Sequence, residues 1–304
     1  MEVKLFVIIV TYKGKRWYDR CFTSLRESTI PVQTIVVDNA SNDGSVEYIK
    51  EHFPEIHLIE SQENLGFGRA NNIAMRYALD NGCDYVFLLN QDTWIEANAI
   101  ENLVKVHHLH QEYGILSPMH LRADKKSLYM QIIDGNRNTP NKALISDLYC
   151  DTKKDVYPVK YVNAAAWLLP RKTLETVGGF NPIYYQYEED DDYLNRVRFH
   201  KLGIGVCLQS RIVHDHSNLF GSLPISKTRI RHEQLLKVRF ANPGNDESIS
   251  KFRRYLIRKV IVMYLRGNKS EAKTLWADFK FLGRNSKAIV NSRLESRKVQ
   301  ASWL

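Results

Sequence analysis

Short apolar runs alternate with amphipathic segments over residues 1–117. Four apolar runs predict buried strands, at Leu5–Val10, Thr34–Asp38, His57–Ile59 and Tyr85–Leu89. Between them, apolar positions at helical spacing predict helices over Trp17–Ser28, Ser45–His52 and Arg69–Leu79. Asp43-Gly-Ser45 is a start signal for the second helix, and Asn81-Gly82 is a stop signal for the third. This alternation is typical of an α/β fold with a Rossmann-like, mostly parallel central sheet and flanking helices.

The pattern is less regular from residue 118 to 170, which predicts hairpins and loops closed by a strand-like run at Tyr157–Leu169. Helices are expected at 171–178 and 190–202, with a short strand at Gly205–Leu208 between them and the tail. Beyond residue 225 the pattern predicts three basic amphipathic helices, at about 228–240, 249–266 and 270–282. We therefore place a boundary near Ser222–Pro224, between a body over 1–222 and a C-terminal helical extension over 223–304.

Charge divides along the same boundary. The chain carries a net charge of +9, but residues 223–304 hold 19 Lys and Arg against 6 Asp and Glu, or +13. Residues 1–222 hold 24 against 28, or −4. An acidic body with a basic tail indicates chemistry in the body and an anionic surface as partner of the tail.

Composition excludes several other classes. No apolar run approaches the ~20 residues that span a bilayer, and Leu5–Val10 is too short for a secretory signal. The four cysteines, Cys21, Cys83, Cys150 and Cys207, lie far apart, which disfavours a disulfide framework or a zinc site and favours a reducing compartment. We expect a cytoplasmic protein.

Polar residues collect where the predicted strands end. They are Thr11 and Tyr12, then Asp38 and Asn39, then Asn90, Gln91 and Asp92. Ligands of parallel sheets bind at the carboxyl ends of the strands. A carboxylate there suits a hard divalent cation, so Asp92 is a candidate metal ligand, with Asn90 adding an amide oxygen or holding a water. The alternative is an ordinary turn or cap residue, the more frequent role of an Asp after a strand.

A second acidic signal is the run Glu188, Glu189, Asp190, Asp191 and Asp192, which follows the aromatic stretch Tyr184–Tyr187. Acids at a helix start favour the helix dipole, which is the structural alternative. The aromatic stretch instead suggests a floor for a sugar ring beside a carboxylate that activates a hydroxyl.

A third signal is Val213-His-Asp-His216, whose two imidazoles are candidate ligands of a transition metal, with His214 and His216 as alternatives.

Phosphate-binding loops of the glycine-rich kind are absent from the sequence. The turn after the first strand reads Thr11-Tyr-Lys-Gly-Lys15, and Gly66-Phe-Gly68 is not completed to GxGxxG. Dinucleotide oxidoreductases and P-loop NTPases are therefore disfavoured, and phosphates are expected to need a metal.

These motifs together resemble family 2 glycosyltransferases of the GT-A fold, especially the bacterial rhamnosyltransferase-like branch. The resemblance runs in order over about residues 4–222, through Ile8–Tyr12 (IIVTY), Val36–Ser41 (VVDNAS), Asn64–Asn72 (NLGFGRANN), Leu88–Thr93 (LLNQDT), Val177–Phe180 (VGGF), Tyr187–Asp192 (YEEDDD) with Arg196, and His214. It implies a nucleotide-binding half over 1–117 and an acceptor half over 118–222.

The resemblance also implies roles. The donor nucleotide would contact Thr11, Tyr12, Asp38, Asn39, Asn71, Asn72, Asn90 and Gln91. Asp92 and His214 would hold Mn²⁺ or Mg²⁺; Asn90 stands where the family has the first Asp of its DxD, and this departure weakens any role of residue 90 as a direct ligand. Asp190 would be the catalytic base, with Glu189, Asp192, Tyr187 and Arg196 supporting the acceptor site.

The implied reaction is a single displacement with inversion, from a dTDP-, UDP- or GDP-sugar to a hydroxyl of a glycan or lipid-linked glycan. Such acceptors suggest that the basic tail attaches the enzyme to the inner face of the cell membrane through anionic lipid, with Lys251, Arg253, Arg254, Arg258 and Lys259 as candidate contacts. A helix packed on the body with a solvated basic face is the alternative. The sequence leaves the oligomeric state open, with a homodimer as one arrangement.

The sequence suggests three alternative functions. A nucleic-acid-binding protein is suggested by the pI of 9.2, but the crevice is acidic and the basic residues lie in the tail, so no nucleic acid is expected. A sugar nucleotidyltransferase needs a glycine-rich and basic loop, of which Thr11–Lys15 supplies only part. An inactive homologue acting as a scaffold is allowed by Asn90.

Overall fold

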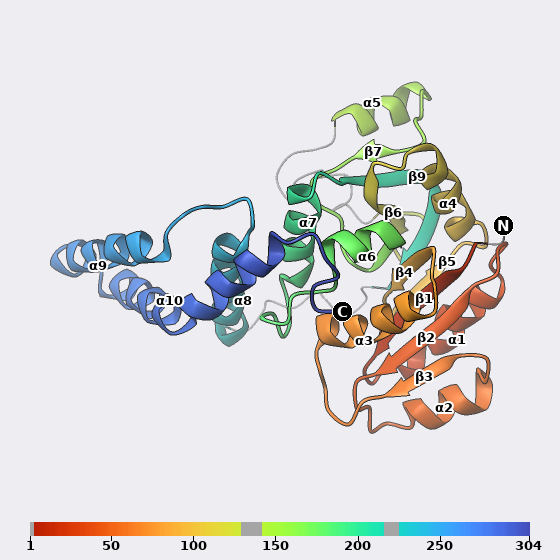
Figure 1. Ribbon diagram of the computed structural model, residues 1–304, viewed down its shortest axis with the longest axis horizontal. Coiled ribbons are helices and arrows are strands. Elements are labelled where there is room, and N and C mark those ends of the chain that lie inside the picture. Colours follow the sequence, from red (N-terminus) through yellow and green to blue (C-terminus); the bar gives the residue numbers. More distant parts are fainter. Residues whose placement is uncertain (1–2, 129–141, 216–224) are drawn as a thin grey trace.

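The computed structural model describes residues 3–128, 142–215 and 225–304, with side chains from residue 229 onward in the last range (Figure 1). Its centre is one mixed sheet with the strand order β3-β2-β1-β4-β8-β6-β9-β5, and β7 pairs with β9. The strands are β1 (Leu5–Thr11), β2 (Gln33–Asp38), β3 (His57–Glu60), β4 (Tyr85–Leu89), β5 (Thr93–Ile95), β6 (Tyr113–Leu121), β7 (Tyr157–Pro158), β8 (Ala166–Pro170) and β9 (Gly203–His214).

Most strands of the sheet point the same way. β1 is parallel to β2 and β4, β2 is parallel to β3, and β6 is parallel to β9. β8 is antiparallel to both β4 and β6, so β6 and β9 run in the direction of β4. The predicted GT-A-like arrangement, a mostly parallel sheet with helices around it, is confirmed.

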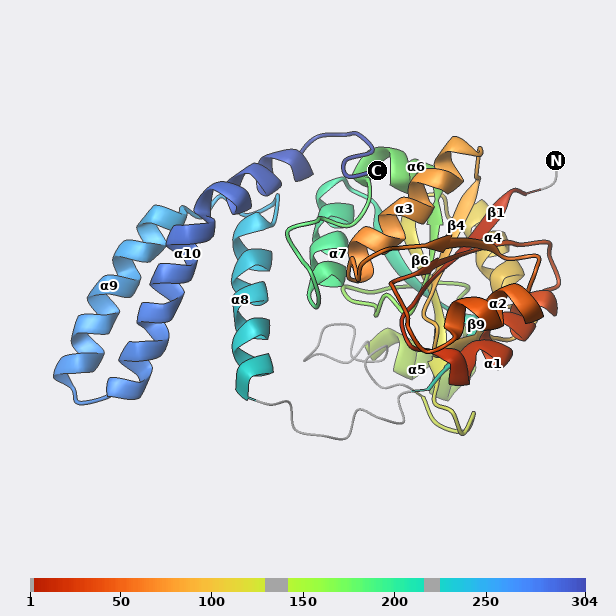
Figure 2. The ribbon, with the colours of Figure 1, turned by 90° about the horizontal axis from the view of Figure 1, so that it is seen from below.

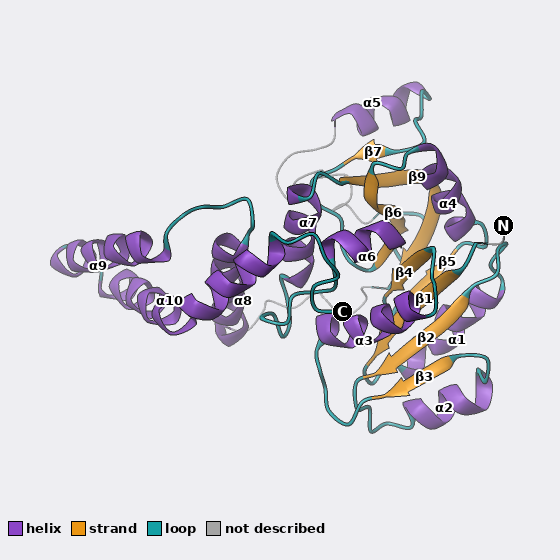
Figure 3. Ribbon diagram, viewed as in Figure 1, coloured by secondary structure: helices purple, strands orange, loops and turns teal. Residues whose placement is uncertain are grey.

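Helices cover both faces of the sheet (Figure 3). They are α1 (Lys15–Arg26), α2 (Ser45–His52), α3 (Phe67–Asp80), α4 (Ala99–Leu109), α5 (Lys142–Cys150), α6 (Arg171–Val177) and α7 (Glu189–Phe199), followed by α8 (Ile225–Ala241), α9 (Ile249–Leu265) and α10 (Lys269–Ser296) in the extension. Alternate residues of β1 enter opposite cores, because side chains along a strand alternate between its faces. Phe6 and Ile8 pack with α3, α6 and α7, whereas Val7 and Ile9 pack with α1, α2 and α4.

Several elements differ from the sequence-based expectations. The run Tyr157–Leu169 is not one strand, because β7 and β8 are separate and pair with different partners. β9 is longer than the expected Gly205–Leu208 and ends at His214. The irregular region also contains a helix, α5, and α10 extends to Ser296, well past the expected residue 282.

The extension forms its own small core and also contacts the body (Figure 2). Leu236 of α8, Leu256 of α9 and Leu282 of α10 share that core. Contacts to the body include Arg231 with Glu188 and Lys237 Nζ with the Ile183 carbonyl. The proposed boundary at Ser222–Pro224 lies outside the described residues, so the division at 222/223 stays a prediction.

Candidate active site

The carboxyl ends of β1, β2, β4 and β9 share one edge of the sheet because these strands run the same way. This edge carries Thr11 and Asp38 as the last residues of β1 and β2, Asn90 directly after β4, and His214 as the last residue of β9. The expectation that these residues share one edge of the sheet is therefore confirmed, while their contact with a ligand stays a prediction.

Thr11 and Asp38 form a buried polar pair at this edge. Thr11 Oγ1 donates to Asp38 Oδ2 at 2.9 Å, and the Ser41 backbone N–H donates to Asp38 Oδ1 at 2.8 Å. Both side chains are almost fully buried. The Asp38 carboxylate thus fixes the loop after β2 against the end of β1.

Gln91 fixes the loop after β1. Its amide accepts from the Tyr12 N–H at 3.0 Å and donates to the Tyr12 carbonyl at 3.2 Å. Gly14 lies so close that a Cβ there would meet Gln91 Oε1 at 2.0 Å. The ring of Tyr12 is 43% exposed, so it is presented to solvent beside the edge.

Asn39 connects this edge to the turn before α3. Its amide donates to the Gly66 carbonyl at 3.2 Å and accepts from the Leu65 N–H at 3.1 Å. Gly66 has φ +78°, and a Cβ on it would meet the Tyr185 carbonyl oxygen at 2.2 Å. Only glycine fits this approach of the Tyr185 loop to the start of α3.

Asn71 and Asn72 have surroundings different from those that the resemblance suggested. Asn71 donates to the Phe67 carbonyl within its own helix. Asn72 accepts from the Phe180 N–H at 2.6 Å and donates to the Phe180 carbonyl at 2.7 Å. Both amides are buried and engaged with backbone, which gives them a packing role; their contact with a nucleotide stays a prediction.

Asp92 and His214 are brought together at the same edge. Asp92 Oδ1 lies 3.3 Å from His214 Nε2, and the Asp215 N–H donates to the Asp92 carbonyl at 2.9 Å. His214 is 2% exposed, while the Asp92 side chain is 23% exposed. One carboxylate and one imidazole nitrogen in contact are a fitting partial donor set for a divalent ion.

The rest of that coordination is not supplied by a larger cluster. Within the described ranges, no group of three or more His, Cys, Asp or Glu is arranged to hold a metal. The alternative ligand His216 lies outside the described residues. A cation at Asp92 and His214 would therefore complete its shell with water and phosphate oxygens, as Mg²⁺ sites commonly do.

Asp190 lies in the first turn of α7 and is held in place from two directions. Tyr161 Oη donates to Asp190 Oδ2 at 3.0 Å, and the Asp191 N–H donates to Asp190 Oδ1 at 2.9 Å. The side chain is partly exposed. A carboxylate oriented in this way and open to solvent is suited to accept a proton. The sequence pattern did not predict the role of Tyr161, because no local pattern connects it to Asp190, 29 positions away.

The surroundings of Glu189 alter the protonation of its carboxyl group. Burial, together with the adjacent charge of Asp190, raises the pKa of Glu189 to about 8. Near neutral pH Glu189 is therefore mostly a neutral acid. A neutral Glu189 relieves the repulsion that five adjacent carboxylates would otherwise create.

The aromatic stretch before the acids divides between core and surface. Tyr184 is buried and its Oη donates to Asp192 Oδ1 at 3.3 Å, so it is not part of an open floor. Tyr185 and Tyr187 are 55% and 41% exposed. Of the rings in the expected sugar-binding floor, only these two have this exposure. The backbone of Tyr187 has a positive φ of 67°.

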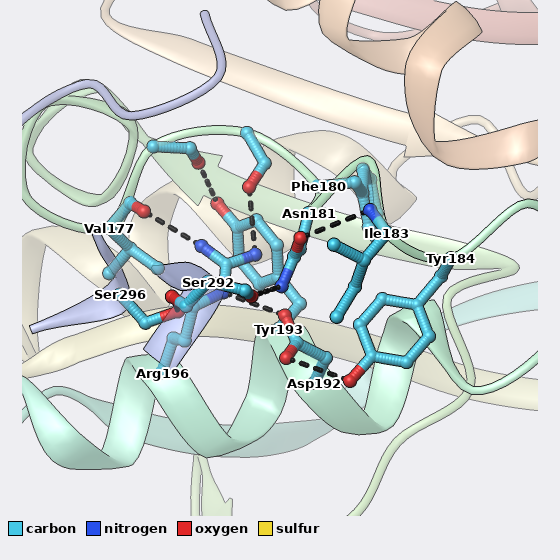
Figure 4. A network of polar contacts seen from close by, with 12 residues as sticks. Val177, Phe180, Asn181, Ile183, Tyr184, Asp192, Tyr193, Arg196, Ser292 and Ser296 are labelled. Atoms are coloured by element: carbon cyan, nitrogen blue, oxygen red, sulfur yellow. Dashed lines mark hydrogen bonds and ion pairs between the residues drawn. The ribbon is translucent and has the colours of Figure 1, made fainter. Parts of the chain in front are cut away.

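Asp192 and Arg196 form a buried ion pair one turn into α7 (Figure 4). Arg196 Nε donates to Asp192 Oδ2 at 2.9 Å, and the other guanidinium nitrogens donate to the carbonyls of Val177 and Gly179 at 2.8 and 2.7 Å. Tyr193 Oη donates to the Gly178 carbonyl between them. Neither charged side chain reaches solvent, and together they hold the 177–179 turn on α7; their support of an acceptor site stays a prediction.

The two acidic parts of the site are joined by one short segment. The Asn90 N–H donates to the Ala165 carbonyl, while Tyr161, four residues earlier, donates to Asp190. Four residues span at most ~14 Å when extended. The loop carrying Asp92 and the helix carrying Asp190 are therefore bound to opposite ends of Tyr161–Ala165.

Glu188 adds a contact that the sequence reading did not find. It is 3% exposed, has φ 67°, and accepts from Arg231 Nε of α8 at 2.9 Å. The extension thereby contacts the residue directly before α7. Nothing in the local pattern of either segment pairs residues 43 positions apart.

Comparison with known proteins identifies relatives of this chain. The family model described as "Glycosyl transferase family 2" matches residues 6–158. The chain is 24% identical to the low-salt glycan biosynthesis hexosyltransferase Agl10 of Haloferax volcanii, over 78% of this chain and 73% of that protein. It is 26% identical to the N-acetylglucosaminyl-diphospho-decaprenol L-rhamnosyltransferase of Mycobacterium tuberculosis, over 75% and 81%.

Solved structures show the same fold. The mannosyltransferase PcManGT of Pyrobaculum calidifontis, in complex with GDP-Man and Mn²⁺, aligns with a TM-score of 0.57 and 19% identity over 82% of this chain and 66% of that one. TarS 1–349 of S. aureus, in complex with UDP-GlcNAc, aligns with a TM-score of 0.57 and 12% identity over 97% and 90%. At these identities the likeness concerns the GT-A fold.

The buried ion pair predicts a large loss of stability. Arg196→Met should reduce the free energy of unfolding in urea by about 3–5 kcal/mol, because Asp192 is left buried without its charged partner. Arg171→Met is the matched control, since Arg171 forms an ion pair of the same i,i+4 spacing with Glu175 at the surface. That change should cost no more than about 1 kcal/mol. Equal losses in the two variants would contradict the role given to Arg196.

The protonation of Glu189 predicts a pH-dependent difference. Between pH 4.5 and about 8 the unfolded chain ionises this carboxyl while the folded chain keeps it protonated. The contribution of Glu189 to the free energy of unfolding is therefore fully present below pH 4.5. It is lost as the pH rises through the pKa of the folded state, by at most about 1.4 kcal/mol per pH unit. Urea unfolding of wild type and Glu189→Gln across this window should show wild type losing stability relative to the variant. A difference in the free energy of unfolding that stays constant across this pH window would refute the raised pKa of Glu189.

Proposed function

Because the chain belongs to glycosyl transferase family 2, we propose that it transfers a sugar, with inversion, from a nucleoside-diphosphate sugar to a hydroxyl of a glycan or lipid-linked glycan. The observation that carries the proposal is one segment with contacts at both ends: Tyr161 donates to Asp190, and Ala165 accepts from Asn90. Two residues after Asn90, Asp92 contacts His214. Rhamnosyltransferases among the relatives, including the dTDP-rhamnosyl transferase RfbF of Shigella flexneri, favour a deoxyhexose donor on dTDP. UDP- and GDP-sugars are the alternatives.

The donor would lie along the carboxyl edge of the sheet. Thr11, Asp38 and Asn39 hold the loops after β1 and β2 in position, and the exposed ring of Tyr12 offers a face for the base. The diphosphate would then extend toward Asn90, Gln91 and Asp92. This placement agrees with the rule that ligands of open α/β sheets bind at the carboxyl ends of the strands.

Asp92 and His214 would hold Mn²⁺ or Mg²⁺, consistent with their carboxylate and imidazole donors. When bound, the ion stabilises the charge that develops on the leaving diphosphate. His214 is the last residue of β9 and is the pairing partner of Thr93, the first residue of β5. Asp92 directly precedes Thr93, so neighbouring strands position both proposed ligands. Asp92 is the more exposed of the two and would be the ligand that is accessible from solvent.

Asp190 would take the proton of the acceptor hydroxyl. As the oxygen of that hydroxyl forms its bond to the anomeric carbon, the bond from that carbon to the diphosphate oxygen breaks, and the proton moves to a carboxylate oxygen of Asp190. The hydrogen bond from Tyr161 keeps the carboxylate oriented. Tyr185 and Tyr187 would offer apolar ring faces to the acceptor.

Removing the metal ligands should abolish tight donor binding. His214→Gln is expected to bind UDP, dTDP or GDP with the weakened affinity that wild type shows in EDTA, because the diphosphate charge is then uncompensated. Isothermal titration with and without Mn²⁺ measures this. The control His108→Gln changes an exposed histidine of α4 and should leave binding intact. Equal wild-type affinity with Mn²⁺ and with EDTA would reject the metal site.

Removing the base should separate chemistry from binding. Asp190→Asn is expected to lose about 10²-fold or more in transfer, because general-base assistance is typically worth 10²–10⁴. Nucleoside diphosphate binding should survive. Transfer is followed as release of nucleoside diphosphate from dTDP-, UDP- and GDP-sugars supplied with candidate acceptor glycans. Asp191→Asn is the adjacent control and should stay within a few-fold of wild type, on the same scale. Near-normal turnover of Asp190→Asn would assign the base elsewhere.

A further inference from the structure

The outward face of α9 is unusually apolar for a surface helix. Ile257, Ile261 and Leu265 follow one another at i, i+4 spacing and are 37%, 54% and 79% exposed. Tyr255, Val262 and Tyr264 are also exposed, at 51%, 40% and 63%. An i, i+4 row forms one continuous ridge along a helix. The ridge is therefore a contiguous apolar strip on the surface.

The strip is not required by the core of the extension. Leu256 and Ile249 of the same helix are buried against α8 and α10, together with Leu282 and Ile289. The helix thus already has a packed inner face. Its outer ridge is a second apolar face, which would cost free energy in water unless something covers it.

Basic side chains lie directly beside the ridge. Arg254 and Arg258 form the neighbouring i, i+4 row, and Lys251 precedes Arg258 by seven residues on the same exposed side. Residues 249–265 contain no Asp or Glu. No ion pair joins these three cations to an acid anywhere in residues 3–128, 142–215 or 229–304.

Two other basic residues of α9 are directed into the hairpin. Arg253 Nε donates to the Phe279 carbonyl, with the guanidinium 4.2 Å from the Phe279 ring centroid. Lys259 Nζ lies 3.9 Å from Glu271 Oε1. The five candidates suggested by the sequence thus separate into two that hold α9 to α10 and three that face outward.

The face also has an accessible position. In both Figure 1 and Figure 2, α9 lies at the end of the molecule opposite the sheet, with α10 beside it. None of the described helices is long and apolar enough to cross a bilayer. The helix can therefore lie along a surface but is not suited to span one.

We propose that the outward face of α9 binds an anionic lipid surface, with the helix parallel to the membrane plane. The apolar ridge would enter the boundary between headgroups and acyl chains, and Lys251, Arg254 and Arg258 would contact the lipid phosphates. Tyr255 and Tyr264 suit the interfacial depth, where aromatic rings with a polar end are enriched.

Charge decides against the other occupants. In a symmetric dimer the same patch would meet itself, and the outward cations would face one another without any acid on α9. A nucleic acid would satisfy the cations but leave Ile257, Ile261 and Leu265 against phosphates. Only a surface that is both anionic and apolar uses the whole face.

Co-sedimentation of the full chain with vesicles tests the proposal. Vesicles of a phosphatidylcholine–phosphatidylglycerol mixture should bind the protein, vesicles of phosphatidylcholine alone should bind it far more weakly, and salt should reduce binding. The triple variant Lys251→Gln/Arg254→Gln/Arg258→Gln should weaken the partition coefficient by about a hundred-fold, which corresponds to about 1 kcal/mol for each charge. Ile261→Ser/Leu265→Ser should weaken binding to the mixed vesicles as well.

The control variant Lys126→Gln/Lys172→Gln/Lys201→Gln removes the same charge from exposed positions of the body and should sediment like wild type. Circular dichroism confirms that each variant is folded. Equal sedimentation with both vesicle types, or with neither, would overturn the proposal. The proposal would also be overturned if wild type were a dimer that dissociates in Ile261→Ser/Leu265→Ser. It would be overturned likewise if the control variant reduced vesicle binding as strongly as the triple variant of α9. Binding of a nucleoside diphosphate with Mn²⁺, measured in parallel, tests the donor site independently of this result.

Discussion

A single buried guanidinium joins the first turns of α7 to the turn that precedes it in the fold. Arg196 neutralises Asp192 and also satisfies the carbonyls of Val177 and Gly179, so one side chain joins α7 to the turn after α6. The C-terminal segment closes on the same place, since the Trp303 ring lies 4.8 Å from the guanidinium and the Gly179 N–H donates to the Ser302 carbonyl. Because an unpaired buried charge is costly, these contacts hold α7 against the 177–179 turn.

The position of α7 in turn determines the candidate chemistry. Its first turn carries Asp190, and the Tyr161 hydroxyl orients that carboxylate. The segment that follows Tyr161 reaches the loop after β4, where Asp92 meets His214. A structure built in this way would keep the proposed donor site on the sheet and the proposed proton acceptor on α7 in a fixed relation, which a displacement between two bound substrates requires.

The sequence predicted most of the sheet edge and little of the support behind it. Thr11, Asp38 and Asp92 were found because apolar runs mark strands and polar residues mark their ends. The length of β9 was underestimated, because Gln209 and Arg211 are exposed polar positions that interrupt its apolar run. Tyr161 with Asp190 and Glu188 with Arg231 were invisible, since such pairs are set by tertiary packing and leave no periodic signal.

In the proposed site, Asp92 and His214 bind the ion while Asp190 serves only the proton. Counting protein-bound Mn²⁺ by electron paramagnetic resonance, in the presence of a nucleoside diphosphate, tests this division directly. Wild type and Asp190→Asn are expected to bind one ion equally, whereas His214→Gln should lose it. Loss of the ion in Asp190→Asn, or its retention in His214→Gln, would show that the metal ligands and the base are assigned wrongly.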